Sequence, residues 1–417
     1  MNLENKRIQF KARSETYPGC RIGQSIIGVM DKMLGQTFRC LRLDSTLLTS
    51  GSFRRRPLAY IFSGTLLLTL LLSCASLPPA PQSSCQQIPV GPGPEDFALD
   101  FSRGAGKPRI LVSSHERRGW ERGEIYTVNL DSTSELSATI LPRHGEPEGL
   151  FFSPHGMDIR NVEGQPRLYI INHGPDEVEG PHHVLVYRIL PEALEFLGST
   201  TSEFFYSPND LAIDDRGGFY VSNDARNRGS LLELALSLRN SSVVFCKPGS
   251  IRPGPLASAE ETPEMCILAA EDLASANGVA IQRSPQGNSD SGKVFVATSR
   301  GNSLYVFSRE DSGKLVDRKP IFEAPILDNL FFDNDGRRLL VASHPSGLAF
   351  LRHLKDGTVP SPSVVYGVNL ENGSSETLYS NSGEELSAAS GAFHYKGQLF
   401  ISQVFEPFLL RCKSSGR

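Results

Sequence analysis

The chain has 417 residues, and its 42 Lys and Arg against 46 Asp and Glu give a formal net charge of −4 at pH 7. This slightly acidic balance gives no reason to expect a nucleic-acid-binding protein, because such proteins carry clustered basic charge. The 38 Gly and 28 Pro indicate many turns between short elements, and the length suits two ordinary domains or one large all-β domain.

Residues 53–74, FRRRPLAYIFSGTLLLTLLLSC, have the pattern of an export signal rather than of folded structure. Arginines precede an apolar run that is short for a membrane-spanning helix, which needs roughly 20 apolar residues. The end of the run resembles a bacterial lipobox, in which Cys74 receives a lipid and becomes the mature N-terminus. A plain signal peptide cleaved nearby and a retained anchor are the alternatives. We therefore expect an exported protein, either held at the cell envelope as a periplasmic or outer-membrane lipoprotein or secreted.

The signal divides the chain into an N-terminal extension of uncertain role (1–52), the signal (53–74), a Pro-rich flexible tether (75–84) and one domain (85–417). The cysteines beyond the signal are Cys85, Cys246, Cys266 and Cys412. An even number of cysteines in an exported chain suggests disulfides. A bridge between Cys85 and Cys412 would tie the ends of the domain together. The pairing of Cys246 with Cys266, which flank an apparent insertion at 248–268, is left open.

A pattern recurs six times along the domain. A small or polar pair opens an apolar strand, a turn with Gly or Asp follows, and a second apolar strand ends in small or polar residues. The opening pairs are Glu95-Asp96, His155-Gly156, Asn209-Asp210, Asn277-Gly278, Asp328-Asn329 and Ser390-Gly391. A repeat of about 60 residues with four short strands is typical of an all-β, six-bladed β-propeller with four-stranded blades. A pair of β-sandwiches, the alternative, does not explain the common register.

The opening pairs predict a metal site. Equivalent blades would place these pairs around one end of the central channel, where they supply mostly carboxylate and amide oxygens. Calcium prefers such hard oxygen ligands, and the chain lacks the paired Cys or His spacing of a zinc site. Two charges and three neutral amides would hold an ion that stays electrophilic, and Asp96 with Asp210 would suit a second, more buried ion. Turn formation is the plain alternative, since Asn, Asp and Gly favour turns in any fold.

The motifs GPEDFALD, SPHGMDI, LYIINH, SPNDLAID, ASANGVAI, LDNLFFD and VASHPSG resemble the serum paraoxonase/arylesterase family, which is related to the SMP-30/gluconolactonase-like propellers. The resemblance implies two calcium ions, and a disulfide between Cys85 and Cys412. It assigns the catalytic calcium to Glu95, Asn209, Asn277, Asp328 and Asn329. It assigns the structural calcium to Asp96, Asp210 and the backbone carbonyl of Met157. A catalytic dyad maps onto His155 and His173.

Three departures limit the transfer. Gly174 follows His173 where the family has Pro, and Ser343 replaces a free Cys of the animal members, so no thiol role is transferred. The animal proteins keep an uncleaved N-terminal helix for attachment to lipoprotein particles, whereas this chain has Cys74 and its lipobox-like surroundings.

These residues predict a calcium-dependent arylesterase and lactonase acting on small-molecule esters or lactones. His155 would activate a water, and His173 would tune His155 or relay its proton. Asp328 as base or nucleophile is a rival. A non-catalytic, calcium-stabilised binding propeller and a sugar-lactone hydrolase are the alternative functions. The chain has no Gly-x-Ser-x-Gly elbow, which disfavours a serine hydrolase.

Four further histidines complete the expectations. His344 ends a strand in a position that suits the pocket wall, and His115 is expected at the rim. His182 and His183 are expected to begin an outer strand and to face solvent.

Overall fold

The computed structural model describes residues 77–414 except 82, 105, 132–135, 177–179, 229, 231–232, 234–235, 262–263, 284–288 and 334–335. The N-terminal extension, the export signal and Cys74 lie outside the described residues. Within the described part of the chain, no helix is both long and apolar enough to cross a bilayer.

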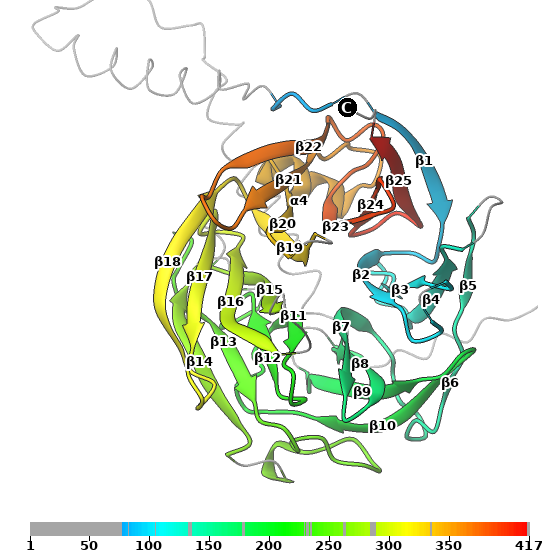
Figure 1. Ribbon diagram of the computed structural model, residues 1–417, viewed down its shortest axis with the longest axis vertical. Coiled ribbons are helices and arrows are strands. Elements are labelled where there is room, and N and C mark those ends of the chain that lie inside the picture. Colours follow the sequence, from blue (N-terminus) through cyan, green and yellow to red (C-terminus); the bar gives the residue numbers. More distant parts are fainter. Residues whose placement is uncertain are drawn as a thin grey trace, which may run out of the picture. The chain divides into compact units, whose positions relative to one another are not determined.

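Six sheets stand around a central axis (Figure 1), and their strands pair antiparallel except for a short edge strand in the second sheet, which confirms the six-bladed propeller. Blades 1 to 3 comprise β2 (Pro94–Asp100), β3 (Arg109–Ser114), β4 (Glu124–Asn129) and β5 (Ala138–Ile140); β7 (Pro154–Val162), β8 (Gln165–Asn172), β9 (His183–Ile189) and β10 (Leu194–Thr200), with β6 (Arg143–His144) added at the edge; and β11 (Pro208–Ile213), β12 (Phe219–Asn223), β13 (Ser241–Cys246) and β14 (Cys266–Leu273). Blades 4 to 6 comprise β15 (Ala276–Arg283), β16 (Asp290–Thr298), β17 (Ser303–Arg309) and β18 (Leu315–Glu323); β19 (Leu327–Phe332), β20 (Arg338–Ser343), β21 (Ser363–Asn369) and β22 (Ser375–Asn381); and β23 (Ala389–Tyr395), β24 (Gln398–Gln403), β25 (Phe408–Ser414) and β1 (Ser83–Pro89).

The ring closes in blade 6, where the N-terminal strand β1 pairs antiparallel with the C-terminal strand β25. Cys85 lies opposite Cys412 in this register, and the two form the expected disulfide across 327 residues of sequence. In the chain-entropy account, a loop of this size stabilises the fold by about 5–6 kcal/mol. A second disulfide joins Cys246 in β13 to Cys266 in β14, so the pairing left open by the sequence exists in blade 3.

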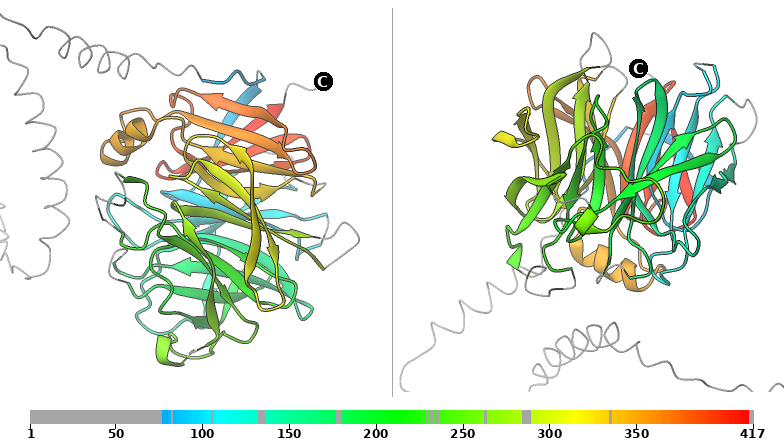
Figure 2. Two further views of the ribbon diagram at one scale, coloured as in Figure 1. Left: turned by 90° about the vertical axis from the view of Figure 1, so that its left-hand side faces the viewer. Right: turned by 90° about the horizontal axis from the view of Figure 1, so that it is seen from below.

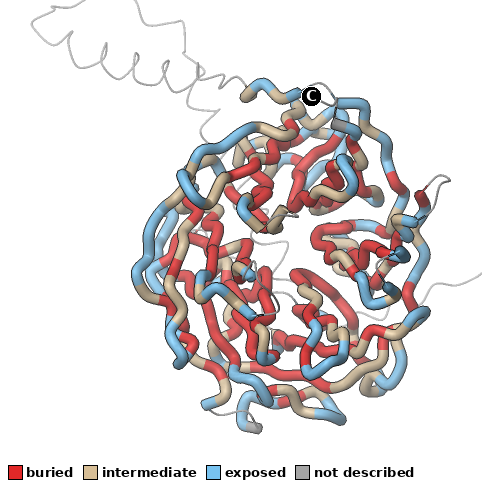
Figure 3. The backbone as a smooth tube through the Cα atoms, in the orientation of Figure 1, coloured by how far each residue is buried: buried red, intermediate tan, exposed pale blue. Residues whose placement is uncertain are grey.

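The core lies between the sheets. Middle strands such as β3 and β12 are buried along their whole length, because each sheet packs against a neighbour on both faces. Exposed backbone is concentrated at the outer rim, as along β1 (Figure 3). The α-helix α4 (Gly347–Lys355) follows β20 and lies on one face of the propeller (Figure 2). Ser346 caps it, since its Oγ accepts the Ala349 N–H.

The six innermost strands share one irregularity. In β2, β7, β11, β15, β19 and β23 the pairing with the next strand shifts at the residues that open each sequence repeat. A bulge leaves residues out of the ladder and re-aims their side chains. The repeated opening pairs therefore lie where the backbone turns side chains away from regular pairing and toward neighbouring blades.

Glycine allows the closest approaches between these strands. A Cβ on Gly156 would lie 2.5 Å from the Asn209 carbonyl oxygen and 2.5 Å from the Asp210 Cα. A Cβ on Gly278 would lie 2.6 Å from the Asp328 carbonyl oxygen. The two glycines therefore let one blade pack directly against the opening pair of the next.

Candidate metal and active site

Five side chains of the opening pairs, which come from the innermost strands of four blades, form the set that we call the oxygen ring: Glu95, Asn209, Asn277, Asp328 and Asn329. Asn329 Nδ2 donates to Glu95 Oε1 at 3.0 Å, so blades 1 and 5 meet across the axis of the propeller. Equivalent bulges place Asn209 on β11 and Asn277 on β15. Four buried oxygens of this set have no hydrogen-bond partner among the described residues: Glu95 Oε2, Asn209 Oδ1, Asn277 Oδ1 and Asn329 Oδ1.

Buried acceptors without donors cost free energy, on the order of 1–3 kcal/mol each, and native proteins satisfy most of them. Carboxylate and amide oxygens are the ligands that calcium prefers. The described residues contain no group of three or more His, Cys, Asp or Glu side chains that could hold a metal ion, so a site here relies on the amides. The unpartnered oxygens fit a hard cation bound by this mixed set.

Asp96 and Asp210 are also buried, with exposed fractions of 1% and 5%. Asp96 Oδ2 accepts the Met157 N–H of the next blade at 2.6 Å, and Asp210 Oδ2 accepts the Val279 N–H of the next blade at 2.8 Å. Burial raises the pKa of both carboxyls well above the usual range, and the Asp210 charge raises the pKa of Asp96 further. Two neighbouring buried carboxyls of this kind fit a second cation, which would offset their charge.

His155 and His173 form the expected pair, and the structure extends it to a third ring. His155 Nδ1 lies 2.7 Å from His173 Nε2, and His173 Nδ1 lies 3.2 Å from His182 Nδ1. His155 Nε2 lies 3.5 Å from Glu95 Oε2 and so faces the oxygen ring. The three histidines form a chain that leads from the ring into blade 2.

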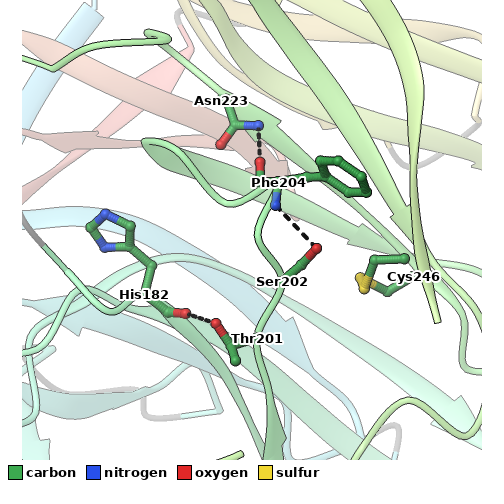
Figure 4. Close-up of a disulfide and its surroundings, with 7 residues drawn as sticks. His182, Thr201, Ser202, Phe204, Asn223 and Cys246 are labelled. Atoms are coloured by element: carbon green, nitrogen blue, oxygen red, sulfur yellow. Dashed lines mark hydrogen bonds between the residues drawn. A yellow bond between two sulfur atoms is a disulfide. The ribbon is translucent and has the colours of Figure 1, made fainter. Parts of the chain in front are cut away.

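The expectation that His182 and His183 are solvent-facing on an outer strand is wrong. Their exposed fractions are 5% and 4%, and β9 lies between β8 and β10 rather than at the edge. Segment 250–257 covers this end of blade 2, since His183 Nε2 bonds to the Ala257 carbonyl at 3.1 Å. Thr201 Oγ1 donates to the His182 carbonyl at 2.6 Å (Figure 4).

Burial favours the neutral form of His173 and His182. It lowers the pKa of His173 well below the usual value, and the neighbouring His155 lowers it further. Burial lowers the pKa of His182 to about 4. Neutral imidazole both donates and accepts a proton, so a chain of such rings can pass one along.

His344 is buried next to Asp328, and its place in a pocket wall stays a prediction. Its Nε2 lies 2.8 Å from Asp328 Oδ2, and its ring packs on Phe350 of α4 with centroids 4.6 Å apart. Burial raises the pKa of Asp328, while this hydrogen bond lowers it in part. His344 therefore occupies one carboxylate oxygen of Asp328, the residue that rivals His155 as the proposed base.

His115 is fully buried rather than at the rim, so that expectation is wrong. Trp120 folds back over it with ring centroids 4.5 Å apart, and the Trp120 indole N–H donates to the Gly174 carbonyl at 3.3 Å. The burial of His115 depends on this loop path, which strand periodicity does not reveal.

Sequence reasoning missed Arg117. Its side chain is 9% exposed, and Nη2 lies 3.6 Å from Glu95 Oε2 at the oxygen ring. The run HERRGWER contains three arginines with no pattern that separates them. Arg118, the next residue, instead pairs with Glu406 at 3.2 Å and bonds to the His353 carbonyl.

Comparison with known proteins places the chain in a family. The arylesterase family model matches residues 118–413. The chain is 24% identical over 294 residues to human serum paraoxonase/lactonase 3, covering 69% of this chain and 76% of the relative. It is 25% identical over 260 residues to human serum paraoxonase/arylesterase 2, covering 61% and 67%. A solved structure described as a gluconolactonase has a TM-score of 0.45 at 14% identity, covering 82% of this chain and 95% of the other. The family model spans most of the described propeller, and the chain belongs to the arylesterase family.

Proposed function

We propose that this protein is an exported, calcium-dependent hydrolase of carboxylic esters and lactones. One observation carries the proposal: four buried oxygens without hydrogen-bond partners lie around a ring that His155 Nε2 faces. The names of the relatives, which pair paraoxonase with lactonase or arylesterase, support the same substrate class.

The proposed catalytic calcium is held by Glu95, Asn209, Asn277, Asp328 and Asn329. When bound, it would supply Lewis-acid polarisation of the substrate carbonyl, an effect worth several kcal/mol. The second ion is assigned to Asp96, Asp210 and the Met157 carbonyl. That site links the innermost strands of neighbouring blades and would act on stability rather than on chemistry.

His155 is the proposed general base. With Nδ1–H donated to His173 Nε2, its Nε2 lone pair faces the ring and can take a proton from an attacking water. His173 then uses its own Nδ1–H toward His182 Nδ1, so the three rings hold one set of tautomers. A general base contributes roughly 10²–10⁴-fold in rate.

The rival function is a calcium-stabilised binding propeller without chemistry. Such a scaffold needs the Asp96 and Asp210 pair but has no use for a second ring of unpartnered oxygens with a histidine beside it. A hydrolase that acts on sugar lactones remains the alternative enzyme.

The test is hydrolysis of phenyl acetate and a series of aliphatic and sugar lactones, before and after removal of calcium with a chelator. We expect chelation to abolish turnover and added calcium to restore it. Activity that survives chelation would contradict the metal-dependent mechanism. Two bound calcium ions with no turnover of any ester or lactone would establish the scaffold.

A further inference from the structure

Arg117 is a buried cation without a hydrogen-bond acceptor. Its Nε and Nη2 have no partner among the described residues, although the side chain is only 9% exposed. The nearest acid, Glu95 Oε2, lies 3.6 Å from Nη2, which is beyond hydrogen-bond distance. The other oxygen of Glu95 accepts from Asn329.

Arg109 shows what a structural buried arginine looks like in the same blade. It is fully buried, its Nε donates to Asp100 at 2.7 Å, and its Nη1 and Nη2 donate to the carbonyls of Pro191 and Leu190 at 2.8 and 3.0 Å. Every nitrogen of Arg109 therefore has an acceptor. Arg117 lacks this set and faces the candidate active site instead of a blade contact.

Glu95, the acid that forms an ion pair with Arg117, is also a proposed calcium ligand. In the proposed function the two charges of calcium offset the carboxylates of Glu95 and Asp328. Unpaired buried charges are costly, so this position calls for an anion that arrives from outside the chain. The planar guanidinium fork matches the geometry of a carboxylate.

We propose that Arg117 forms an anion-binding position beside the ring and takes a carboxylate group of the ligand. The inference rests on the proposed function for the location of the reacting ester. The carboxylate has two possible sources: the acid released by hydrolysis, or a second acidic group on the substrate itself. Arg117 would thus favour acidic esters or hold the acid product.

Trp120 allows binding to be measured without turnover. It is the only tryptophan of the chain, it lies three positions after Arg117, and it packs on the buried His115. We expect butyrate to change the Trp120 fluorescence and neutral butyramide to leave it unchanged, in calcium-loaded and in chelated protein.

Arg117→Gln should weaken butyrate binding at least tenfold, and Arg117→Lys should retain part of it because the charge stays. Arg103→Gln is the matched control. Arg103 belongs to the same blade and donates to Asn129 in an exposed contact, so its loss should leave butyrate binding unchanged. If Arg117→Gln does not fold, wild-type protein that fails to distinguish butyrate from butyramide overturns the proposal by itself.

Kinetics separate the two sources of carboxylate. Monophenyl glutarate differs from phenyl butyrate by one terminal carboxylate. If the substrate carries the recognised group, Arg117→Gln lowers the ratio of kcat/KM for these two esters at least tenfold. If the product carries it, the ratio holds and competitive inhibition by butyrate weakens tenfold. Unchanged binding, ratio and inhibition would refute the anion position, leaving Arg117 as a counter-charge for Glu95. Arginine-dependent butyrate binding without hydrolysis of any ester would refute only the proposed function.

Discussion

Gly156→Ala tests whether the close packing of blade 2 on blade 3 positions the site. The new Cβ would lie 2.5 Å from the Asn209 carbonyl oxygen and from the Asp210 Cα, where ordinary contacts begin at 3.4 Å. Both atoms belong to the backbone, so β7 and β11 must separate by about 1 Å, at a cost of about 1–3 kcal/mol. A displacement of this size near the reacting groups costs about 10²-fold in rate.

The free energy of unfolding is measured with a denaturant, and kcat/KM is measured with phenyl acetate. Gly106→Ala serves as the control, because a Cβ there meets no atom within 4 Å. Gly156 does not adopt a positive φ, so only the lack of space distinguishes the two substitutions. A Gly156→Ala variant that matches Gly106→Ala in both stability and rate would refute the argument that this approach positions Asn209 and Asp210.

Further predictions separate the two proposed ions and the histidine chain. Asn277→Ala should abolish phenyl acetate hydrolysis while the melting temperature stays close to that of the wild type, since only a ring oxygen is lost; a large drop in melting temperature would assign Asn277 to the fold. Asp96→Ala should lower the melting temperature of the calcium-loaded protein, because it removes the acceptor of the Met157 N–H, and an unchanged value would contradict the structural role. Burial raises the pKa of Asp96 and Asp210 above the usual 3.8, so without calcium the folded chain holds protons that the unfolded chain has already lost. The free energy of unfolding of chelated protein should therefore fall as the pH rises from about 4 through these raised pKa values, and calcium should remove that fall; denaturant midpoints at several pH values with and without chelator check the sign. His182→Phe should lower kcat more than it raises KM, because it removes the partner of His173 and leaves the ring intact, and an unchanged kcat would exclude His182 from the relay.

The fold was predictable because the same local requirement recurs in every blade. Each innermost strand has a bulge at the equivalent position, and a small or polar pair occupies that position. The sequence therefore shows six such pairs at regular spacing. The continuous apolar runs of the following strands, such as β3 and β12, indicate burial on both faces in the same way. The opening pairs and the apolar runs both involve residues that are adjacent in the chain, so both patterns can be recognised from the sequence alone.

The parts that could not be predicted depend on contacts between distant segments. His182 is buried beside His173, and segment 250–257 covers that end of blade 2 through the contact of His183 with Ala257, which is 74 positions away in the sequence. Arg117 faces the ring while Arg118 turns toward Glu406, and only the path of the loop decides between them. A lone histidine or arginine carries no periodic pattern that would mark either role.

Asn209 and Asp210 show how the propeller joins fold and site in consecutive residues. The pairing of β11 with β12 is interrupted between Pro208 and Leu211, so the two side chains need not follow strand alternation. Asp210 accepts N–H groups from its own strand and from Val279 of the next blade, whereas the Asn209 oxygen has no partner among the described residues. Asp210 thus connects blade 3 to blade 4, and Asn209 presents the oxygen that we propose as a calcium ligand. Because the same bulge places both side chains, a change that loosens the contact between these strands should also displace the proposed ligand oxygen of Asn209.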